Sequence, residues 1–450
     1  MMKKLIIAFC SLAINCAVAQ DAGMLKPEDV IKLTIENNFD IQIAKNNTQI
    51  AKNNNNIGLV GGGASTNGNN QAGSSGMLPQ IALTASPTWS SNDIQQKYSN
   101  GTDIQKPGVT SSNVSAALTM TWYFFDGLKM FATKKKLNRN EELSNLQFRQ
   151  TVENTLLEAL TAYYQAISTR QLIKSLQVSL SVAEEQKKLA EERLKAGTGS
   201  NVEVLQTQID YNNLQVQILQ QQNLLNEQKV DLNAIFKRGP ETDFAVPDTI
   251  IIQTKPEYNA ATENLEKNNS SILIGAKNIE ISELVLKEFR GNRYPRVGVI
   301  GNYALSRSEN TAGFALLNQS LGYTLGFTAS WNLLNNLATH TAIKNQLVQL
   351  SSDKLRLDAA RTTERSNLFK AFYSFQNNLT IMEIEKQSAG FSHQNLDIAS
   401  QRYKLGLSAF VEYRTVEQSY EETVLRLSQA MFNTKISELN YLKAQGLLVH

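Results

Sequence analysis

Four long tracts of this sequence contain no proline and almost no glycine, and the longest would form helices that exceed an ordinary globular core. The tracts are residues 128–196, 200–238, 332–405, where only Gly390 interrupts, and 407–445. Proline inside a helix costs about 3 kcal/mol, so its absence permits long uninterrupted helices. A helix over 128–196 would be about 100 Å long. Its apolar residues recur at steps of three and four, which is typical of coiled-coil-like packing; they include Val152, Leu156, Leu160, Tyr163 and Ile167.

The chain also contains a second copy of its own pattern, displaced by 209 residues. The matching positions are Arg193, Lys195, Gly197 and Trp122 in the first half and Arg402, Lys404, Gly406 and Trp331 in the second. We therefore predict a two-fold internal repeat, because separate landmarks share one offset. The first repeat is expected over 20–238, an inter-repeat crossover over 239–262, and the second repeat over 263–450.

Alternating segments precede each of the longest tracts. Apolar residues fall on every second position of 78–90 and 112–125 in the first repeat, and of 294–306 and 320–332 in the second. This alternation predicts strands with one apolar face, each about as long as a barrel strand that crosses a membrane. A soluble sandwich is the alternative, but isolated hairpins would be marginally stable. The aromatic residues expected at a membrane interface are Trp89, Trp122, Tyr123, Phe124 and Trp331.

These elements predict an α+β membrane protein. Four strands are too few to close a barrel, so three copies are expected to complete one of twelve strands. Beyond the first residues, no apolar run approaches the roughly 20 residues of a membrane helix, so a membrane crossing would need strands closed into a barrel. The long coiled-coil-like helices, expected at 128–196, 200–238, 333–405 and 408–445, would form a tunnel outside the membrane.

The first 19 residues are typical of a secretory signal peptide. Lys3 and Lys4 precede an apolar run, and small residues at 17 and 19 suit a cleavage site. Cys16 opens the alternative of a lipoprotein, although the asparagine before it is a poor match. Because Cys10 and Cys16 are the two cysteines, the remaining chain has no thiol for a disulfide or a metal.

No pattern for catalysis is present in the sequence. The three histidines, His340, His393 and His450, lack metal-ligand spacing, and there is no phosphate loop or nucleophile elbow. We therefore expect no catalytic, cofactor-binding or metal site, and no enzyme. A net charge of +3 does not favour nucleic acid as a partner.

Residues 30–38 and the repeated Arg-x-Lys-x-Gly turn followed by Val-Glu resemble the TolC-like outer membrane efflux proteins. The resemblance covers essentially the whole chain after the signal peptide. It implies a homotrimer whose shared twelve-stranded β-barrel lies in the outer-membrane lipid of a Gram-negative bacterium, with a tapering periplasmic tunnel. It also implies a periplasmic adaptor (membrane fusion) protein and an inner-membrane pump as partners. The chain would be the channel-tunnel subunit that passively conducts substrates in efflux or secretion.

The same resemblance suggests functional residues. Gly197 and Gly406 would be the turns at the periplasmic tip, where glycine tolerates the positive φ of a helix end. Candidates for the aperture or gate are Glu203, Glu412 and Tyr403. Candidates for adaptor contacts are Arg193, Lys195, Arg402, Lys404, Leu407 and Ser408. Some family members carry a latch arginine at the position of Leu407 and Ser408, and this chain has none there. The ordinary reading is a glycine C-cap with charges that answer the helix dipole.

Other functions remain open from the sequence. A periplasmic coiled-coil scaffold or adaptor would keep the helices and the signal peptide but would lack lipid-facing strands. An envelope enzyme on a helical frame is disfavoured by the missing catalytic residues. Residues 58–76 are rich in Gly, Asn and Ser and are predicted to be a flexible insert.

Overall fold

The structure is a computed structural model that describes residues 24–60, 76–312, 315–335 and 337–448. The predicted signal peptide lies outside the described residues, as does most of the insert predicted at 58–76. The described residues form two compact units. The turn unit takes its residues from Met1–Asn38, Leu156–Lys255 and Ser374–Leu439; the sheet unit takes them from Phe39–Thr155, Pro256–Tyr373 and Asn440–His450.

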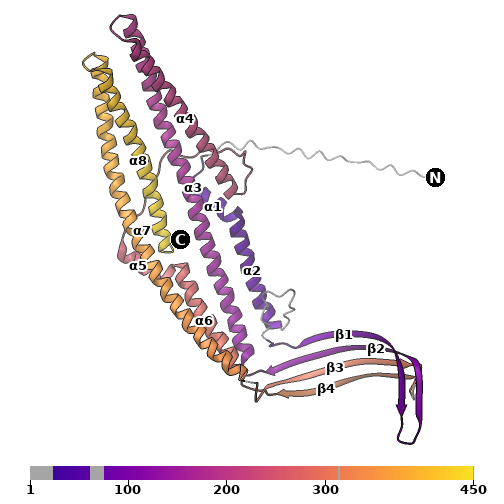
Figure 1. Cartoon of the computed structure of the whole chain (residues 1–450). Coiled ribbons are helices and arrows are strands. Elements are labelled where there is room, and N and C mark those ends of the chain that lie inside the picture. The colour runs from indigo at the N-terminus through magenta and orange to yellow at the C-terminus, as the bar shows by residue number, and fades with distance from the viewer. Residues whose placement is uncertain (1–23, 61–75, 313–314, 336, 449–450) are drawn as a thin grey trace, which may run out of the picture. The chain divides into compact units, whose positions relative to one another are not determined.

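Long helices dominate the described chain (Figure 1). The helices are α1 Pro27–Asn37, α2 Phe39–Val60, α3 Lys129–Lys195, α4 Asn201–Ile235, α5 Tyr258–Asn268, α6 Ser270–Gly291, α7 Ala338–Lys404 and α8 Phe410–Ala444. The strands are β1 Gln80–Lys97, β2 Asp103–Phe125, β3 Arg296–Asn310 and β4 Leu317–Ser330. None of these described helices is both long enough and apolar enough to cross a membrane.

Helices in the two halves of the chain match in length. Both α3 and α7 have 67 residues, and both α4 and α8 have 35. Each later helix begins 209 residues after its earlier counterpart. The 11-residue helices α1 and α5 and the 22-residue helices α2 and α6 correspond at an offset of 231. The helices therefore recur as a set, with one change of offset between the short and the long ones.

The two compact units do not follow the domain boundaries predicted at 20–238, 239–262 and 263–450. The first part of α3 belongs to the sheet unit and the rest to the turn unit, and α7 is divided in the same way. The predicted crossover also ends earlier, because α5 already begins at Tyr258. A helix of 67 residues is longer than one compact unit, so each unit contains segments of both halves.

The predicted apolar seam of α3 is buried. All five of its named residues have exposed fractions of 5% or less. In the turn unit, Leu176 and Ala183 continue the seam and pack with Leu214 and Ile218 of α4. Helices α3 and α4 therefore pair through an apolar stripe, as the steps of three and four predict.

The strands form one antiparallel sheet in chain order, β1-β2-β3-β4 (Figure 1). They are longer than the sequence predicted: β1 continues to Lys97 and β2 begins at Asp103. These extra residues are mostly polar, with only a few scattered apolar side chains such as Ile94 and Val109, so hydrophobic alternation could not detect them. Large apolar side chains are exposed on the sheet, among them Leu83, Leu325 and Phe327. The sheet therefore presents an apolar face that its own chain leaves open.

The start of α3 is defined by backbone geometry. Gly127 has φ +73°, and its position lies so close to the Gly291 carbonyl that a Cβ would clash. The Asp126 carboxylate then accepts from the Met130 amide at 3.0 Å and caps the helix. Leu128 before α3 and Leu337 before α7 both adopt positive φ. The predicted start of the second long helix at 333 is wrong for this reason, since a left-handed residue interrupts the helix.

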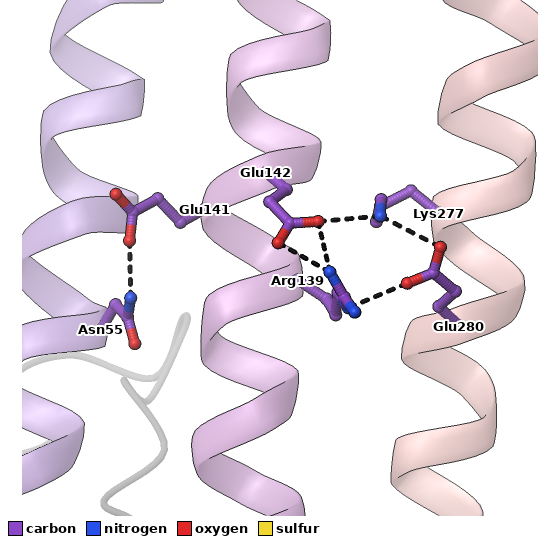
Figure 2. Close-up of polar contacts among 6 residues, drawn as sticks. All are labelled: Asn55, Arg139, Glu141, Glu142, Lys277 and Glu280. Carbon is purple, nitrogen blue, oxygen red and sulfur yellow. Dashed lines mark hydrogen bonds and ion pairs between the residues drawn. The ribbon is translucent and has the colours of Figure 1, made fainter.

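A charged network ties α3 to α6 within the sheet unit (Figure 2). The Glu142 carboxylate lies 2.7 Å from Arg139 and 2.8 Å from Lys277. Glu280 pairs with the same two cations, at 2.8 and 3.0 Å. The Lys277 ammonium and the Arg139 guanidinium hold the pKa of Glu142 below its ordinary value. The two carboxylates and the two cations offset one another's charge and link α3 to α6.

Candidate functional site

Two tight turns join the long helices of the turn unit. Gly197 follows α3 with φ +75°, and Gly406 follows α7 with φ +73°. At the first turn, the Arg193 carbonyl accepts from the amides of Thr198 and Gly199, both at 3.0 Å. At the second, the Leu407 amide donates to the Arg402 carbonyl at 2.8 Å. Both ends use a glycine in the left-handed region to satisfy the last helical carbonyls.

Tyr403 lies in the last turn of α7 and is only 1% exposed. Its hydroxyl donates a short hydrogen bond to the Glu203 carboxylate on α4. Arg193 of α3 donates to the Tyr403 carbonyl at 2.5 Å, and its guanidinium carbon lies 4.4 Å from the centre of the Tyr403 ring. The residues Arg193, Glu203 and Tyr403, here called the clasp, join three helices.

Electrostatics favour this arrangement. The side chains of Arg193 and Glu203 are 22% and 15% exposed, and their charged atoms lie 3.9 Å apart. Burial, followed by the neighbouring Glu203 carboxylate, raises the pKa of Tyr403 above its ordinary value. The phenol therefore stays protonated and can donate to Glu203 across the physiological range.

A second aromatic layer lies beneath the clasp. The rings of Tyr403 and Tyr413 stack at 5.4 Å with 22° between their planes, and Phe410 lies 5.9 Å from Tyr403. Tyr413 is fully buried, and its hydroxyl donates to Glu417 at 3.0 Å. Stacked aromatic rings add roughly 0.5–1.5 kcal/mol beyond the area that they bury. This layer supports Tyr403 from the α8 side.

Carboxylates gather next to that layer. The pKa of Glu417 is raised to about 7, chiefly by burial and in addition by the nearby Glu421 and Asp210 carboxylates, while the hydrogen bond from Tyr413 lowers it. Arg414 counters part of this effect and donates to Asp210 at 2.6 Å. Burial also raises the pKa of Glu421. The site therefore includes an acid that changes its charge near neutral pH.

The second turn lacks a clasp of its own. Arg402 and Glu412 stand 209 residues after Arg193 and Glu203, and their charged atoms also lie 3.9 Å apart. Their side chains, however, are 54% and 56% exposed. The position that corresponds to Tyr403 is Leu194, which is 39% exposed. The same pair of charges is thus covered by an aromatic ring at one site and open at the other.

The predicted residues fall into two groups. Glu203, Tyr403 and Arg193 lie together, so Arg193 is turned inward although we expected it to contact a partner. Glu412 is separate from them and pairs with Arg402. The other candidates for adaptor contacts lie at the surface: Lys195 and Leu407 are exposed, Lys404 is exposed and pairs with Glu185 at 3.6 Å, and Ser408 is half-buried with a buried hydroxyl oxygen.

Sequence reasoning missed part of the site. Tyr413, Glu417, Asp210 and Arg414 were not singled out. The i,i+4 spacing of Tyr413 and Glu417 on one helix could have indicated their hydrogen bond. The contact between Arg414 and Asp210 joins α8 to α4, and nothing in a single sequence pairs those two positions.

The predicted interface aromatics lie on the sheet. Trp122 and Trp331 stand near strand ends, and their indole N–H groups donate at 3.0 Å to the carbonyls of Met77 and Arg293. Phe124 contacts the Trp122 ring edge to face. Tyr123 points to the other face, where it carries the Arg296 guanidinium at 4.3 Å. Trp89 lies within β1, opposite Ser112.

Comparison with known proteins finds a family model that matches part of the chain and a curated relative of similar length. The sequence profile of the family described as "Outer membrane efflux protein" matches residues 64–236. The proteases secretion protein PrtF of Dickeya chrysanthemi is 17% identical over 384 residues, which cover 84% of this chain and 81% of that protein.

Solved structures share the fold. The Campylobacter jejuni CmeC outer membrane channel superposes with a TM-score of 0.74 at 12% identity, covering 94% of this chain and 86% of that one. The outer membrane protein VceC of Vibrio cholerae superposes with a TM-score of 0.70 at 14% identity, covering 93% and 96%. The match of residues 64–236 to the outer membrane efflux protein family, the secretion relative and the shared fold together support an outer-membrane channel role in efflux or secretion.

Proposed function

We propose that the chain is a duplicated unit and that three copies close one twelve-stranded barrel in the outer-membrane lipid. The observation that carries this proposal is the four-stranded sheet, whose outer strands β1 and β4 have no further neighbour among the described residues. Its exposed apolar face would be costly in water and suits lipid. Four strands are too few to close, so the barrel must be shared.

The long helices then extend the barrel into the periplasm as a passive tunnel. A periplasmic adaptor protein would bind the exposed residues at the two turns, and an inner-membrane pump would supply the energy and select the substrate. Lys195, Arg402, Lys404 and Leu407 are exposed and available for the adaptor. Arg193 is left out of this surface because its side chain is engaged in the clasp.

The clasp is proposed to keep the tunnel closed. It joins α7 to both α3 and α4, so these helices cannot separate at the turn without breaking it. Arg193 stands in for the latch arginine that is missing at Leu407 and Ser408. Opening would exchange these protein contacts for contacts with the adaptor or with water. A hydrogen bond to a charged group contributes about 1.5–3 kcal/mol, which an adaptor could supply.

Membrane extraction and bilayer recording test the proposal together. The full chain should remain in the membrane pellet after carbonate washing, because barrel strands are inserted in lipid. A periplasmic scaffold would wash off. The purified protein should run as a trimer and should produce discrete conductance steps in planar bilayers. A monomer that is released by carbonate and gives no conductance would overturn the proposal.

A further inference from the structure

We infer that β4 of one copy pairs antiparallel with β1 of the next in one defined register, with Thr324 opposite Ser90. The inference rests on the proposed trimeric duct and adds to it the residue-level seam between copies. It is drawn from the chain's own internal junction between β2 and β3. The partner is therefore a second copy of this chain.

The two hairpins of the sheet obey one set of offsets. Gln80 lies opposite Thr121 in the first hairpin, and Arg296 lies opposite Ser330 in the second. Each β3 residue therefore corresponds to the β1 residue 216 positions earlier, and each β4 residue to the β2 residue 209 positions earlier. The correspondence holds along the hairpins, to the matching pairs Asn92 with Val109 and Ser308 with Asn318.

Side-chain contacts follow the same offsets. The Trp122 indole donates to the Met77 carbonyl at 3.0 Å, and the Trp331 indole donates to the Arg293 carbonyl at 3.0 Å. Trp331 lies 209 positions after Trp122, and Arg293 lies 216 positions after Met77. The two hairpins are thus equivalent in strand register and in how each is anchored next to the helices.

The same offsets, applied to the pairing of β2 with β3 within one chain, give the pairing of β4 with β1 of the next copy. Within the chain, β2 pairs with β3 so that Ser115 lies opposite Ser306. The residue corresponding to Ser115 is Thr324 on β4, and the residue corresponding to Ser306 is Ser90 on β1. By the same rule, Ala116 opposite Leu305 becomes Leu325 opposite Trp89. Strand β4 then lies opposite residues 84–97, within the bounds of β1.

The faces of the strands agree with this register. Leu325 is 68% exposed and Trp89 is 74% exposed, and the register places both on the apolar face of the sheet. A shift by one residue would put Leu325 opposite Thr88 or Ser90 and turn the apolar side chains of one strand to the other face. The apolar face continues across the seam only when the shift is an even number of residues.

The helices beside the sheet also favour a second copy over a charged partner. In the chain, the α3–α6 seam carries the network of Figure 2. The corresponding positions on the outer helices α7 and α2 are neutral: Val348 for Arg139, Ser351 for Glu142, Asn46 for Lys277 and Gln49 for Glu280. Val348 on α7, and Ile43 and Ile50 on α2, are exposed apolar residues. A neutral face on α7 therefore matches a neutral face on α2 of the next copy.

Cysteine pairs test the register in the full chain, expressed in outer membranes. The test variant carries Ser90→Cys and Thr324→Cys. Within one chain β1 and β4 are separated by two strands, about 14 Å, which is too far for a disulfide. Oxidation, or a short thiol cross-linker, should therefore link neighbouring copies and produce a covalent ladder up to the trimer, which a reductant reverses.

The matched control is Ser115→Cys with Ser306→Cys, at the corresponding internal positions. This pair should form a disulfide within one chain, so the free thiols are lost while the chain still runs as a monomer on a denaturing gel. Two register controls combine Thr324→Cys with Thr88→Cys or with Asn92→Cys. These shift the partner by about 7 Å along the strand, and we expect about tenfold less cross-linked trimer from them.

Each outcome decides a different point. Stronger linking at Thr88 or Asn92 would overturn the register and leave the trimeric duct standing. No linking at any of the three positions, with closure of the internal control, would overturn the pairing of β4 with β1. The mass of the wild-type protein then distinguishes the two proposals. A trimer would support the duct but not the β4–β1 pairing, and a monomer would exclude both.

Discussion

The two helical turns have the same backbone and different environments. Gly197 and Gly406 adopt nearly the same φ, and an arginine–glutamate pair lies 3.9 Å apart at each turn. They differ at the residue after the arginine, which is Leu194 at the first turn and Tyr403 at the second. The clasp contains Tyr403 from the second turn and the charged pair of the first.

This difference shows that the contribution of an ion pair to stability depends on how far neighbouring side chains shield it from water. Exposed ion pairs contribute between zero and about 1 kcal/mol because water screens them. Glu203 and Arg193 are largely removed from water and share hydrogen bonds with Tyr403. Glu412 and Arg402 remain open to solvent. Two turns with matching residues can therefore differ in burial: the charged pair is covered at one turn and open to solvent at the other.

The largest expected difference in stability is between alanine substitutions of Tyr403 and Leu194. Replacing Tyr403 with Ala removes a buried ring that stacks on Tyr413, and we expect a loss of about 3–5 kcal/mol in local opening free energy. Replacing Leu194 with Ala, at the corresponding exposed position, should cost less than about 1 kcal/mol. Hydrogen exchange of the amides around both turns measures the opening. Similar losses in the two variants would contradict the comparison.

The next largest difference is expected between alanine substitutions of the two arginines. Arg193→Ala leaves Glu203 partly buried without its cation, so we expect a loss of about 1.5–3 kcal/mol at the clasp. Arg402→Ala removes an exposed pair and should cost no more than about 1 kcal/mol. The same exchange experiment gives both values. If Arg402→Ala proved the more damaging change, the exposed turn would be the latch.

Glutamine substitutions of the two glutamates should have different effects, one on gating and the other on ion selectivity. Glu203→Gln weakens the acceptor of the Tyr403 hydroxyl, so we expect a higher open probability in planar bilayers. Glu412→Gln removes an exposed carboxylate, which in a threefold ring would attract cations, so it should shift the reversal potential in a salt gradient. Reversal potentials that stay unchanged in Glu412→Gln would exclude that carboxylate from the aperture.

A further prediction concerns pH and the acids next to the clasp. The pKa of Glu417 is about 7 in the folded chain, against an ordinary value of 4.5. The folded state holds this proton more tightly than the unfolded chain does, so protonation of Glu417 stabilises the fold. The stabilisation is complete below about pH 4.5 and is lost as the pH rises through about 7. Protection of α8 amides should fall over that window.

Glu417→Gln should reduce this pH dependence, whereas Glu412→Gln, on the same helix but exposed, should leave it unchanged. Glu421 contributes in the same direction, because burial raises its pKa as well. A pH profile that is identical in the wild type and Glu417→Gln would remove Glu417 as the source of the dependence.

Much of the fold could be predicted from the sequence. The expected helices at 128–196, 200–238 and 408–445 differ from α3, α4 and α8 by only a few residues, because glycine and proline bracket them. The ends of β1 and β2 could not be predicted in this way. Residues of β1 beyond Ser90 are mostly polar, and they extend the strand chiefly through pairing with β2.

The site was predictable only in part. Gly197 and Gly406 are visible in the sequence because they interrupt helical tracts. The contact of Arg193 with Tyr403 joins residues 210 positions apart, and it depends on how α7 packs against α3. Arg193 and Arg402 stand in the same Arg-x-Lys-x-Gly pattern at their turns, so the burial of one and the exposure of the other required the structure.

One recording tests the central claim, that three copies form a duct which the clasp keeps closed. Wild-type protein and the variant Tyr403→Phe are compared in planar bilayers under the same salt. The phenylalanine keeps the ring, its stacking and the Arg193 contact, and it removes only the hydroxyl that donates to Glu203. We predict discrete steps in both proteins, with a larger conductance or open probability in the variant. Equal conductance and open probability in the two proteins would contradict the account.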